Sequence, residues 1–325
     1  MRRRFHAVLT VAAVLLLAAT AAGSCGAWHW LLDLAGHFRA YWLGAAAVGL
    51  AIAARRPRSL ACACCGLAVA GNAWSLLPFW LPPPGVLPPT AAAAGEAMPE
   101  ARGPLTLILA NLHRLNPDKS RAVAYLRDRR PDVAVLLEVD SAWQAHLSSL
   151  DEIYPHRIVE PREDNFGIAV LSRWPLADRR VVTLGGTPFP NVDATVEFRN
   201  ARVRLLATHP HPPLTAAYAA LQLSQFRALA DEAAATVGPC IAVGDFNATP
   251  WSLPYRTFVA RSGLRDTALG RGVQPTWNAR LPAPRIPIDH VFASPDVAVV
   301  RRAVGPDIGS DHFPVEATLV LAPAE

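Results

Sequence analysis

Charged residues are scarce in this sequence, and their scarcity excludes an ordinary soluble protein. Only 18% of the 325 residues are charged and 52% are hydrophobic, with a mean hydropathy of +0.21. Soluble domains usually carry about 25% charged residues. The composition therefore predicts a membrane portion beside one large domain. The net charge of +5 is weak evidence for a nucleic-acid partner, because much of the arginine lies beside apolar segments.

Several motifs of known chemistry are also missing. The sequence has no His-rich zinc motif, no Gly-rich phosphate loop with Lys and no Gly-x-Ser-x-Gly. These absences argue against a zinc hydrolase, a nucleotide-dependent kinase and a serine esterase. The five cysteines form no disulfide pattern. Cys62, Cys64 and Cys65 could bind a metal, but we interpret them as small packing residues of a helix.

Three long apolar segments occupy the first 81 residues, at about 5–23, 38–54 and 60–81. A helix needs about 20 apolar residues to cross the hydrocarbon core of a bilayer. The first and third segments are long enough, and the middle one is borderline. We predict a transmembrane anchor over residues 1–81. The alternative for the first segment is a cleaved signal peptide, and Cys25 hints weakly at a lipid-modified terminus.

The positive charges predict how this anchor is oriented. Arg2, Arg3 and Arg4 precede the first segment, and Arg55, Arg56 and Arg58 lie between the second and third, whereas residues 24–37 contain no Lys or Arg. Positive clusters stay on the cytoplasmic side. Three crossings then predict a multi-pass protein of the inner (cytoplasmic) membrane with its C-terminal domain on the extracytoplasmic side. If the middle segment does not span, the orientation inverts.

A Pro- and Ala-rich stretch at 82–103 predicts a spacer, followed by a globular domain at 104–325. Asn116 and Pro117 predict a helix start, with Asn116 as the cap. The Ala-rich stretch 214–237 predicts a long helix whose Gln222 and Gln225 face solvent. Predicted strands alternate with these helices; they cover 105–112, 132–139, 165–176, 191–198, 201–208, 286–292 and 315–321.

Polar residues follow the ends of several predicted strands. Asn111, Glu138 and His209 each follow a buried apolar run, and sites in α/β domains collect at such ends. Asp245 and Asn247 stand two residues apart after another run, so along a strand their side chains would point the same way. The alternatives are an Asx-rich turn at Asp245 and Asn247 and a solvated loop start at Glu138.

The complete set of strand-end polar residues suits a phosphate and a hard cation. Mg²⁺ takes oxygen ligands and keeps several waters, and a His backed by a carboxylate can act as acid, base or cation. The set is Asn111, Glu138, His209, Asp245, Asn247, Asp289, Asp311 and His312.

Three ordered motifs resemble the endonuclease/exonuclease/phosphatase superfamily. They are Gly244-Asp-Phe-Asn247, Ile288-Asp-His-Val-Phe292 and Ser310-Asp-His-Phe-Pro-Val315, and the resemblance covers about residues 104–321. It implies an α+β fold of the DNase I-like type, a four-layer α/β/β/α sandwich. It also implies hydrolysis of a phosphodiester or phosphomonoester with Mg²⁺ or Mn²⁺, by in-line attack of water.

The resemblance also implies roles for single residues. Glu138, Asp311 and Asn111 resemble the family's metal-site residues. His312, Asp289, Asp245 and His209 resemble its catalytic residues, and Asn247, Asn111 and Asn165 its phosphate-binding residues. One departure is Leu137, which stands where the family often has Gln before the metal-binding Glu.

The substrate is left open between a nucleic acid, a phospholipid headgroup and an inositol phosphate. The partners that follow are a phosphate-ester substrate and the lipid bilayer, and no protein partner can be deduced. The alternative function is a membrane-anchored binding module with an inactive phosphoesterase-like site.

Overall fold

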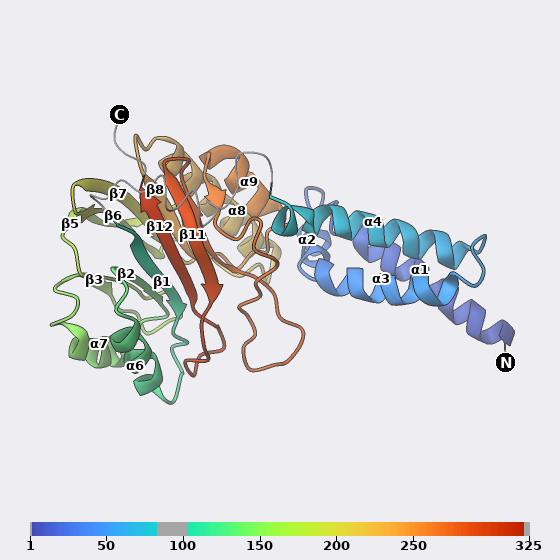
Figure 1. Ribbon diagram of the computed structural model, residues 1–325, viewed down its shortest axis with the longest axis horizontal. Coiled ribbons are helices and arrows are strands. Elements are labelled where there is room, and N and C mark those ends of the chain that lie inside the picture. The colour runs from blue at the N-terminus through green and yellow to red at the C-terminus, as the bar shows by residue number, and fades with distance from the viewer. Residues whose placement is uncertain (1, 83–102, 322–325) are drawn as a thin grey trace.

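The computed structural model of the protein describes residues 2–82 and 103–321 (Figure 1). Most of the predicted spacer, residues 82–103, lies outside the described residues. The remainder consists of a bundle of N-terminal helices that projects from one side of a β-sandwich (Figure 1).

Two six-stranded sheets form the sandwich. The first sheet has the strand order β11-β12-β1-β2-β4-β3, formed by β1 (Leu105–Asn111), β2 (Val133–Leu137), β3 (His156–Glu160), β4 (Ile168–Ser172), β11 (Val297–Val304) and β12 (Val315–Leu321). The second has the order β5-β6-β7-β8-β10-β9, formed by β5 (Leu176–Thr183), β6 (Pro190–Phe198), β7 (Ala201–Thr208), β8 (Cys240–Asp245), β9 (Arg265–Asp266) and β10 (Asp289–Ala293).

Strand alternation explains how each sheet buries both faces. Leu105, Leu107 and Leu109 of β1 join the core between the two sheets, whereas Ile108 and Ala110 face the opposite way into a core beneath the outer helices, as the two-residue period requires. Helices α6 (Lys119–Arg129) and α7 (Ser141–Leu147), followed by the short turn η1 (Ser148–Leu150), cover the first sheet. Helices α8 (Ala216–Ala234) and α9 (Leu253–Ser262) cover the second. The result is the predicted α+β arrangement of helices, sheet, sheet and helices.

Two details of the predicted helices are wrong. Helix α6 starts at Lys119 and its cap is Asp118, whose side chain accepts from the Ser120 N–H. Asn116 instead lies in the preceding loop, where its side chain accepts from the Asp118 N–H and donates to Ile308 O. Gln222 and Gln225 of α8 are buried rather than solvated, because each donates hydrogen bonds to the layer beneath the helix.

The N-terminal bundle consists of α1 (Arg2–Ala22), α2 (Trp30–Gly36), α3 (Arg39–Ala53) and α4 (Leu60–Trp80). In the described residues, α1 and α4 are long and apolar enough to cross a membrane, whereas α3 has only 15 residues. Two of the three predicted spans therefore meet the length requirement and the middle one does not. The cysteines Cys64 and Cys65 pack against α1 and α3 residues, without a bond to one another.

Polar side chains join the bundle internally and to the sandwich. Asn72 of α4 donates to Thr20 Oγ1 of α1 at 2.8 Å and accepts from buried Arg39 of α3. Interhelical hydrogen bonds of this kind hold apolar helices together. At the end of the bundle, Asp33 Oδ1 accepts from Leu253 N at 2.8 Å, and Phe79 packs on Trp251 with ring centroids 6.2 Å apart.

Candidate active site

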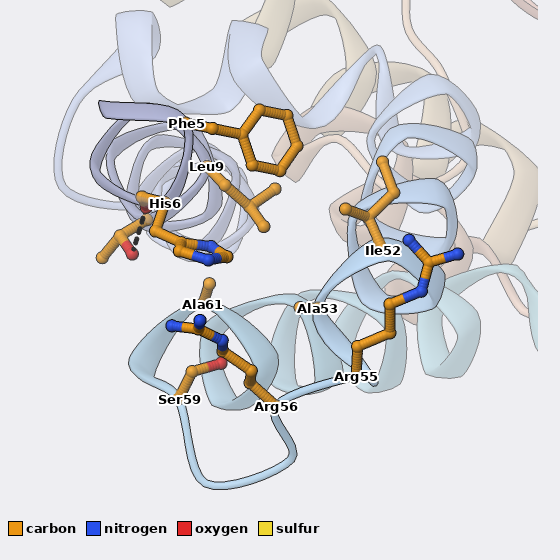
Figure 2. Close-up of a pocket in the computed structure, with 10 residues that line it drawn as sticks. Phe5, His6, Leu9, Ile52, Ala53, Arg55, Arg56, Ser59 and Ala61 are labelled. Carbon is orange, nitrogen blue, oxygen red and sulfur yellow. Dashed lines mark hydrogen bonds between the residues drawn. The ribbon is translucent and has the colours of Figure 1, made fainter. Parts of the chain in front are cut away.

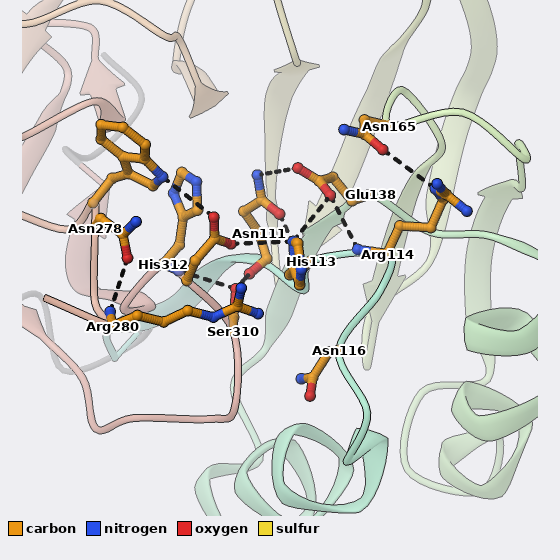
Figure 3. Close-up of polar contacts among 12 residues, drawn as sticks. Asn111, His113, Arg114, Asn116, Glu138, Asn165, Asn278, Arg280, Ser310 and His312 are labelled. Atoms are coloured by element: carbon orange, nitrogen blue, oxygen red, sulfur yellow. Dashed lines mark hydrogen bonds and ion pairs between the residues drawn. The ribbon is translucent and has the colours of Figure 1, made fainter.

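The sheet topology brings four strand ends to one place. Each sheet has one parallel pair among its described strands, β1 with β2 and β7 with β8. Parallel neighbours end at the same edge, and the register pairs Asn111 with Leu137 and Thr208 with Gly244. The residues that follow these ends therefore converge. In this way Asn111 and Glu138 of the first sheet meet His209 and Asp245 of the second (Figure 3 shows the first-sheet side).

Asn111 links the two sheets at this point. Its Nδ2 donates to Glu138 Oε1 and to Asp245 Oδ2, both at 3.1 Å. Its Oδ1 accepts from His113 N at 3.0 Å, so the whole amide is engaged. Glu138 also accepts from Arg114 N through Oε2 at 3.0 Å. Glu138 has a φ of 59°, in the left-handed region that non-glycine residues seldom adopt. The surrounding hydrogen bonds hold it in this conformation.

The turn after β8 corrects one sequence argument. β8 ends at Asp245, so Asn247 lies in a turn, with φ at 49°, and strand alternation does not apply to it. Asp245 Oδ1 accepts from Asn247 N at 2.9 Å, which is an Asx turn. Both side chains nevertheless line the same pocket. A glycine is required at position 244, since a Cβ there would lie 1.9 Å from Thr208 O.

His312 is held between two carboxylates. Its Nδ1 lies 2.9 Å from Asp289 Oδ2, and its Nε2 lies 3.6 Å from Asp245 Oδ2. Burial alone would lower the pKa of His312, but the negative charges of Asp289 and Asp245 outweigh it and raise the pKa to about 10. His312 is therefore an imidazolium at neutral pH.

Asp245 stays ionised because two imidazoles lie beside it. Burial would raise its pKa, but the neighbouring imidazoles of His312 and His209 lower the pKa to about 2. The Nε2 of His209 lies 3.5 Å from Asp245 Oδ2. Burial opposes protonation of His209, yet the hydrogen bond and charge of Asp245 raise its pKa above the ordinary value. The centre of the site is thus a buried, charged cluster.

His290, next to Asp289 in β10, has no place in this cluster. Successive side chains of a strand point to opposite faces, and His290 is directed under α9. There its Nδ1 lies 2.8 Å from Asp266 Oδ2 and its Nε2 lies 2.9 Å from Ala248 O. Both ring nitrogens are engaged in the protein interior, so we assign His290 a structural role.

Two further residues contact Asp311, and neither is among the catalytic, metal or phosphate-binding residues expected from the sequence. His113 Nδ1 lies 3.3 Å from Asp311 Oδ1 and 3.8 Å from Glu138 Oε2. Trp277 donates from Nε1 to Asp311 Oδ2 at 3.3 Å. Neither residue stands at a predicted strand end. The sequence offers two weak signals for them: Pro275-Thr-Trp277 is an irregular aromatic segment that could line a pocket, and His113 follows Asn111 by two positions.

The donor set fits a divalent cation beside Glu138 and Asp311. Asp311 Oδ1 is buried and accepts no hydrogen bond, its nearest cationic neighbour being His113 Nδ1 at 3.3 Å, and carboxylate oxygens are the preferred ligands of Mg²⁺ and Mn²⁺. Within the described residues, Asp245, Asp289 and His312 also offer ligand atoms within 4.8 Å of one another. We interpret these three residues as an ion pair of His312 and Asp289 next to Asp245, and not as a metal site, because His312 Nδ1 already contacts Asp289.

A pocket of about 610 Å³ opens above these residues. One wall is aromatic: Phe166 stacks on Phe189 with centroids 3.7 Å apart, and His211 stacks on Tyr218 at 4.2 Å. Asn165 also lines the pocket, and its Oδ1 accepts from Arg114 Nε at 3.2 Å. Every site residue expected from the sequence therefore lies at or directly below this pocket, while their individual roles stay predictions.

A second pocket of similar volume, about 600 Å³, lies at the far end of the helical bundle (Figure 2). Phe5, Leu9 and Ile52 form its apolar part, and Arg55 and Arg56 border it. No carboxylate borders this pocket. Of these two pockets, the strand-end pocket is the one lined by carboxylates, although the two volumes are nearly equal.

The protein has the architecture of a DNase I-like protein. Its two sheets form a sandwich, and carboxylate, amide and imidazole side chains lie together at the ends of the central strands. The model of the endonuclease/exonuclease/phosphatase family matches residues 108–312, and the chain belongs to that family. Members of this family hydrolyse phosphoester bonds, so the chain falls in the phosphoesterase class. No curated protein matches the chain in sequence.

Solved structures show the same fold. An endonuclease/exonuclease/phosphatase from Beutenbergia cavernae is 27% identical, with a TM-score of 0.56 over 69% of this chain and 73% of that one. D. rerio TDP2, complexed with a single-strand DNA product, is 19% identical, with a TM-score of 0.57 over 67% and 99%. A mannosyl-6-phosphatase from Bacteroides thetaiotaomicron is 19% identical, with a TM-score of 0.53 over 67% and 100%.

Proposed function

We propose that the protein is a divalent-metal-dependent phosphoesterase whose site residues promote in-line attack of water on a phosphoester. The observation that carries this proposal is the buried pair of His312 and Asp289, which faces Asp245 beneath the pocket. An imidazolium cation, held by a carboxylate at the floor of a pocket, stabilises the negative charge that develops on the phosphoryl group. Glu138 and Asp311 would hold Mg²⁺ or Mn²⁺, which supplies further charge stabilisation when bound.

The pKa values separate the roles of the two central groups. With a pKa of about 2, Asp245 is a weak base, so we expect it to orient the attacking water rather than to remove a proton early in the reaction. With a pKa of about 10, His312 stays charged at neutral pH. It is therefore suited to stabilise the added negative charge or to protonate the leaving oxygen. Asp289 holds it in that charged form.

Phosphate contacts would come from the remaining polar residues of the pocket. His209 presents a cationic edge beside Asp245. Asn165 lies at the wall with Arg114. Asn247 donates one amide N–H to Pro210 O at 3.0 Å, and its second amide N–H would donate to a phosphoryl oxygen.

We also propose that α1, α3 and α4 cross the inner membrane together and that the sandwich lies outside the cytoplasm. The support is the length and apolar composition of α1 and α4, the packing of the shorter α3 against both, and the arginines around residues 2–4 and 55–58.

The test is a substrate panel on the purified full chain in detergent, with phosphodiester and phosphomonoester reporters. We expect turnover with Mg²⁺ or Mn²⁺ and loss of turnover in EDTA, restored by either ion. Turnover that persists in EDTA with no metal present would contradict the metal mechanism. A folded chain that binds phosphate esters but turns over none would favour the alternative, a membrane-anchored binding module.

A further inference from the structure

Several exposed apolar side chains lie in the strand-end pocket or in loops that supply residues to it. Leu115, Leu214, Leu281 and Tyr218 are exposed at 66%, 71%, 46% and 39%, whereas most large apolar side chains of the sandwich are buried; Val181, Val237 and Val300 are the other exposed ones among its described residues. Leu214 and Tyr218 line the pocket itself. Leu115 follows the pocket residue Arg114, and Leu281 lies in the loop that carries Trp277. We call these four residues the apolar rim.

The rim comes from three separate parts of the chain, so sequence proximity does not explain it. Leu115 lies in the loop after β1, Leu214 and Tyr218 lie in the loop between β7 and α8 and in the first turn of α8, and Leu281 lies in the loop before β10. Removing a leucine side chain from water is favourable. Scattered exposed leucines are ordinary, but an apolar patch with polar residues around it marks a surface that another apolar body covers.

Each of two rim residues directly follows an arginine in the sequence. Arg114, which lines the pocket, precedes Leu115, and the exposed Arg280 precedes Leu281. Figure 3 shows both arginine side chains. The guanidinium of Arg280 has neither an ion pair nor a side-chain hydrogen bond within the described part of the chain. A surface that alternates leucine with arginine suits an amphiphile with an anionic head.

The loop of Leu281 is attached to the base of the helical bundle. Tyr41, near the start of α3, donates from its hydroxyl to Arg285 O at 2.9 Å and accepts from Arg285 N. In Figure 1 the loop that precedes β10 lies beside this end of the bundle. When α1 and α4 cross a bilayer, this end of the bundle lies at the membrane surface, and the loop lies there with it.

From these contacts we infer that the substrate is a phosphoester carried by a membrane lipid, with its headgroup in the strand-end pocket and its apolar part against the rim. This inference rests on the proposed phosphoesterase function. In the reaction, a water oxygen forms a bond to phosphorus, one phosphorus–oxygen ester bond breaks, and the leaving oxygen takes up a proton. A nucleic-acid substrate would instead favour a basic groove with few exposed leucines.

The experiment compares three substrates with the full chain in detergent and Mg²⁺. The first is phosphatidylcholine and phosphatidylglycerol in mixed micelles with the same detergent, the second is bis(p-nitrophenyl) phosphate as a soluble reporter, and the third is a short single-stranded oligonucleotide. We expect hydrolysis of the lipid phosphoester to exceed that of the oligonucleotide by at least about tenfold. The soluble reporter reports on the catalytic groups alone.

Rim variants then test the assignment. Leu115→Ser combined with Leu281→Ser should lower the ratio of lipid to soluble-reporter rates by about tenfold. Val237→Ser is the matched control, because Val237 is 99% exposed on the sandwich and lies away from the pocket, and this change should leave the ratio as it is.

The outcomes separate the two proposals. Turnover of the soluble reporter without lipid hydrolysis, or a preference for the oligonucleotide, overturns the lipid assignment and leaves the phosphoesterase function standing. An unchanged ratio in the rim variant also overturns the lipid assignment. Turnover of none of the three substrates by a folded, metal-loaded chain overturns both.

Discussion

The chemistry of single residues centres on His312, which the fold keeps protonated. A positioned acid–base group contributes roughly 10²–10⁴-fold to a rate. We therefore expect His312→Ala to lower kcat by at least about a hundredfold while substrate binding is largely kept. Steady-state kinetics on variants whose folding is checked by thermal melting measure this loss. His146→Ala, at an exposed position of α7, is the control and should keep full turnover.

Asp289 acts through His312, so its variant distinguishes a catalytic pair from a structural one. Asp289→Asn keeps the shape but removes the charge that raises the pKa of His312, and it should cost much of the same factor in kcat. The double variant should be no worse than about the worse single one, because two residues that act as a unit do not lose activity additively. Additive losses in the double-mutant cycle would argue that the two residues act independently.

The raised pKa of His312 also predicts how stability depends on pH. The folded protein keeps this proton until the pH approaches about 10, whereas the unfolded chain releases it near pH 6.5. The stabilisation is therefore complete below pH 6.5 and is lost as the pH rises from there towards 10, by about 1.4 kcal/mol per pH unit. Denaturant unfolding in EDTA at pH 6, 8 and 9.5 measures it. His312→Gln should show a shallower decline, and a parallel decline in the two proteins would contradict the assignment.

Several residues of the site could be predicted because their positions follow a simple rule. Asn111 and Glu138 come directly after buried apolar strands, and parallel neighbours deliver such residues to one edge. His113 obeys no such rule: it reaches Asp311 and Glu138 because its backbone has a positive φ of 55°, and no sequence pattern announces that conformation. Trp277 meets Asp311 only through the folding of a long loop against the last strands.

At the scale of the elements, the sequence predicted helix α8 but not the burial of its Gln222 and Gln225. Its Ala-rich sequence predicted a helix correctly, but glutamines at helical spacing look like a solvated face. Gln222 instead donates to Phe246 O and Asn247 O, at 3.3 and 3.0 Å. These carbonyls belong to the turn that follows the last residue of β8, Asp245. The helix therefore supports the turn that carries Asn247, and burial of an amide is explained by the acceptors it satisfies.

This contact predicts a coupling between α8 and the site. Gln222→Leu has a similar volume and leaves two buried carbonyl groups without their donor, which should cost about 1–3 kcal/mol of stability. It should also lower kcat, because the Asn247 turn loses its support. Arg227→Gln, on the exposed face of the same helix, should change neither quantity. Denaturant unfolding and steady-state kinetics decide; intact stability in Gln222→Leu would show that the two bonds contribute little.

Glu138, which directly follows β2, leads to a prediction about metal binding. Glu138 accepts hydrogen bonds from Asn111 and Arg114 N, and its carboxylate charge has no arginine or lysine partner among the described residues. Glu138→Gln keeps the size of the side chain and removes the charge. It should weaken Mn²⁺ binding at least about tenfold with little effect on the melting temperature in EDTA. Isothermal titration calorimetry measures the affinity, with Glu152→Gln, an exposed surface change, as the control.

For the molecule as a whole, the arrangement of the bundle bears on which side of the membrane the sandwich occupies. Helices α1, α3 and α4 pack side by side, and the N-terminus lies at the end of the bundle far from the sandwich (Figure 1). Since α4 begins at that far end, the chain must pass along the bundle three times even though α3 is short. The borderline length of the middle segment therefore does not decide the orientation.

The charges at the two ends of the bundle predict the orientation itself. The far end of the bundle carries six arginines, in residues 2–4 and in the turn at residues 55–58. They are Arg2, Arg3, Arg4, Arg55, Arg56 and Arg58. At the near end Arg39 is buried, and its guanidinium donates to Ser24 Oγ at 2.8 Å. Clusters of accessible arginine remain in the cytoplasm during insertion, so the far end is expected to be cytoplasmic and the sandwich extracytoplasmic. A reporter that works only outside the cytoplasm should be active when fused after Leu321 and inactive when fused at Arg58, between α3 and α4. The reverse pattern would mean that the bundle inserts the other way round, and activity at both positions would mean that α4 does not span.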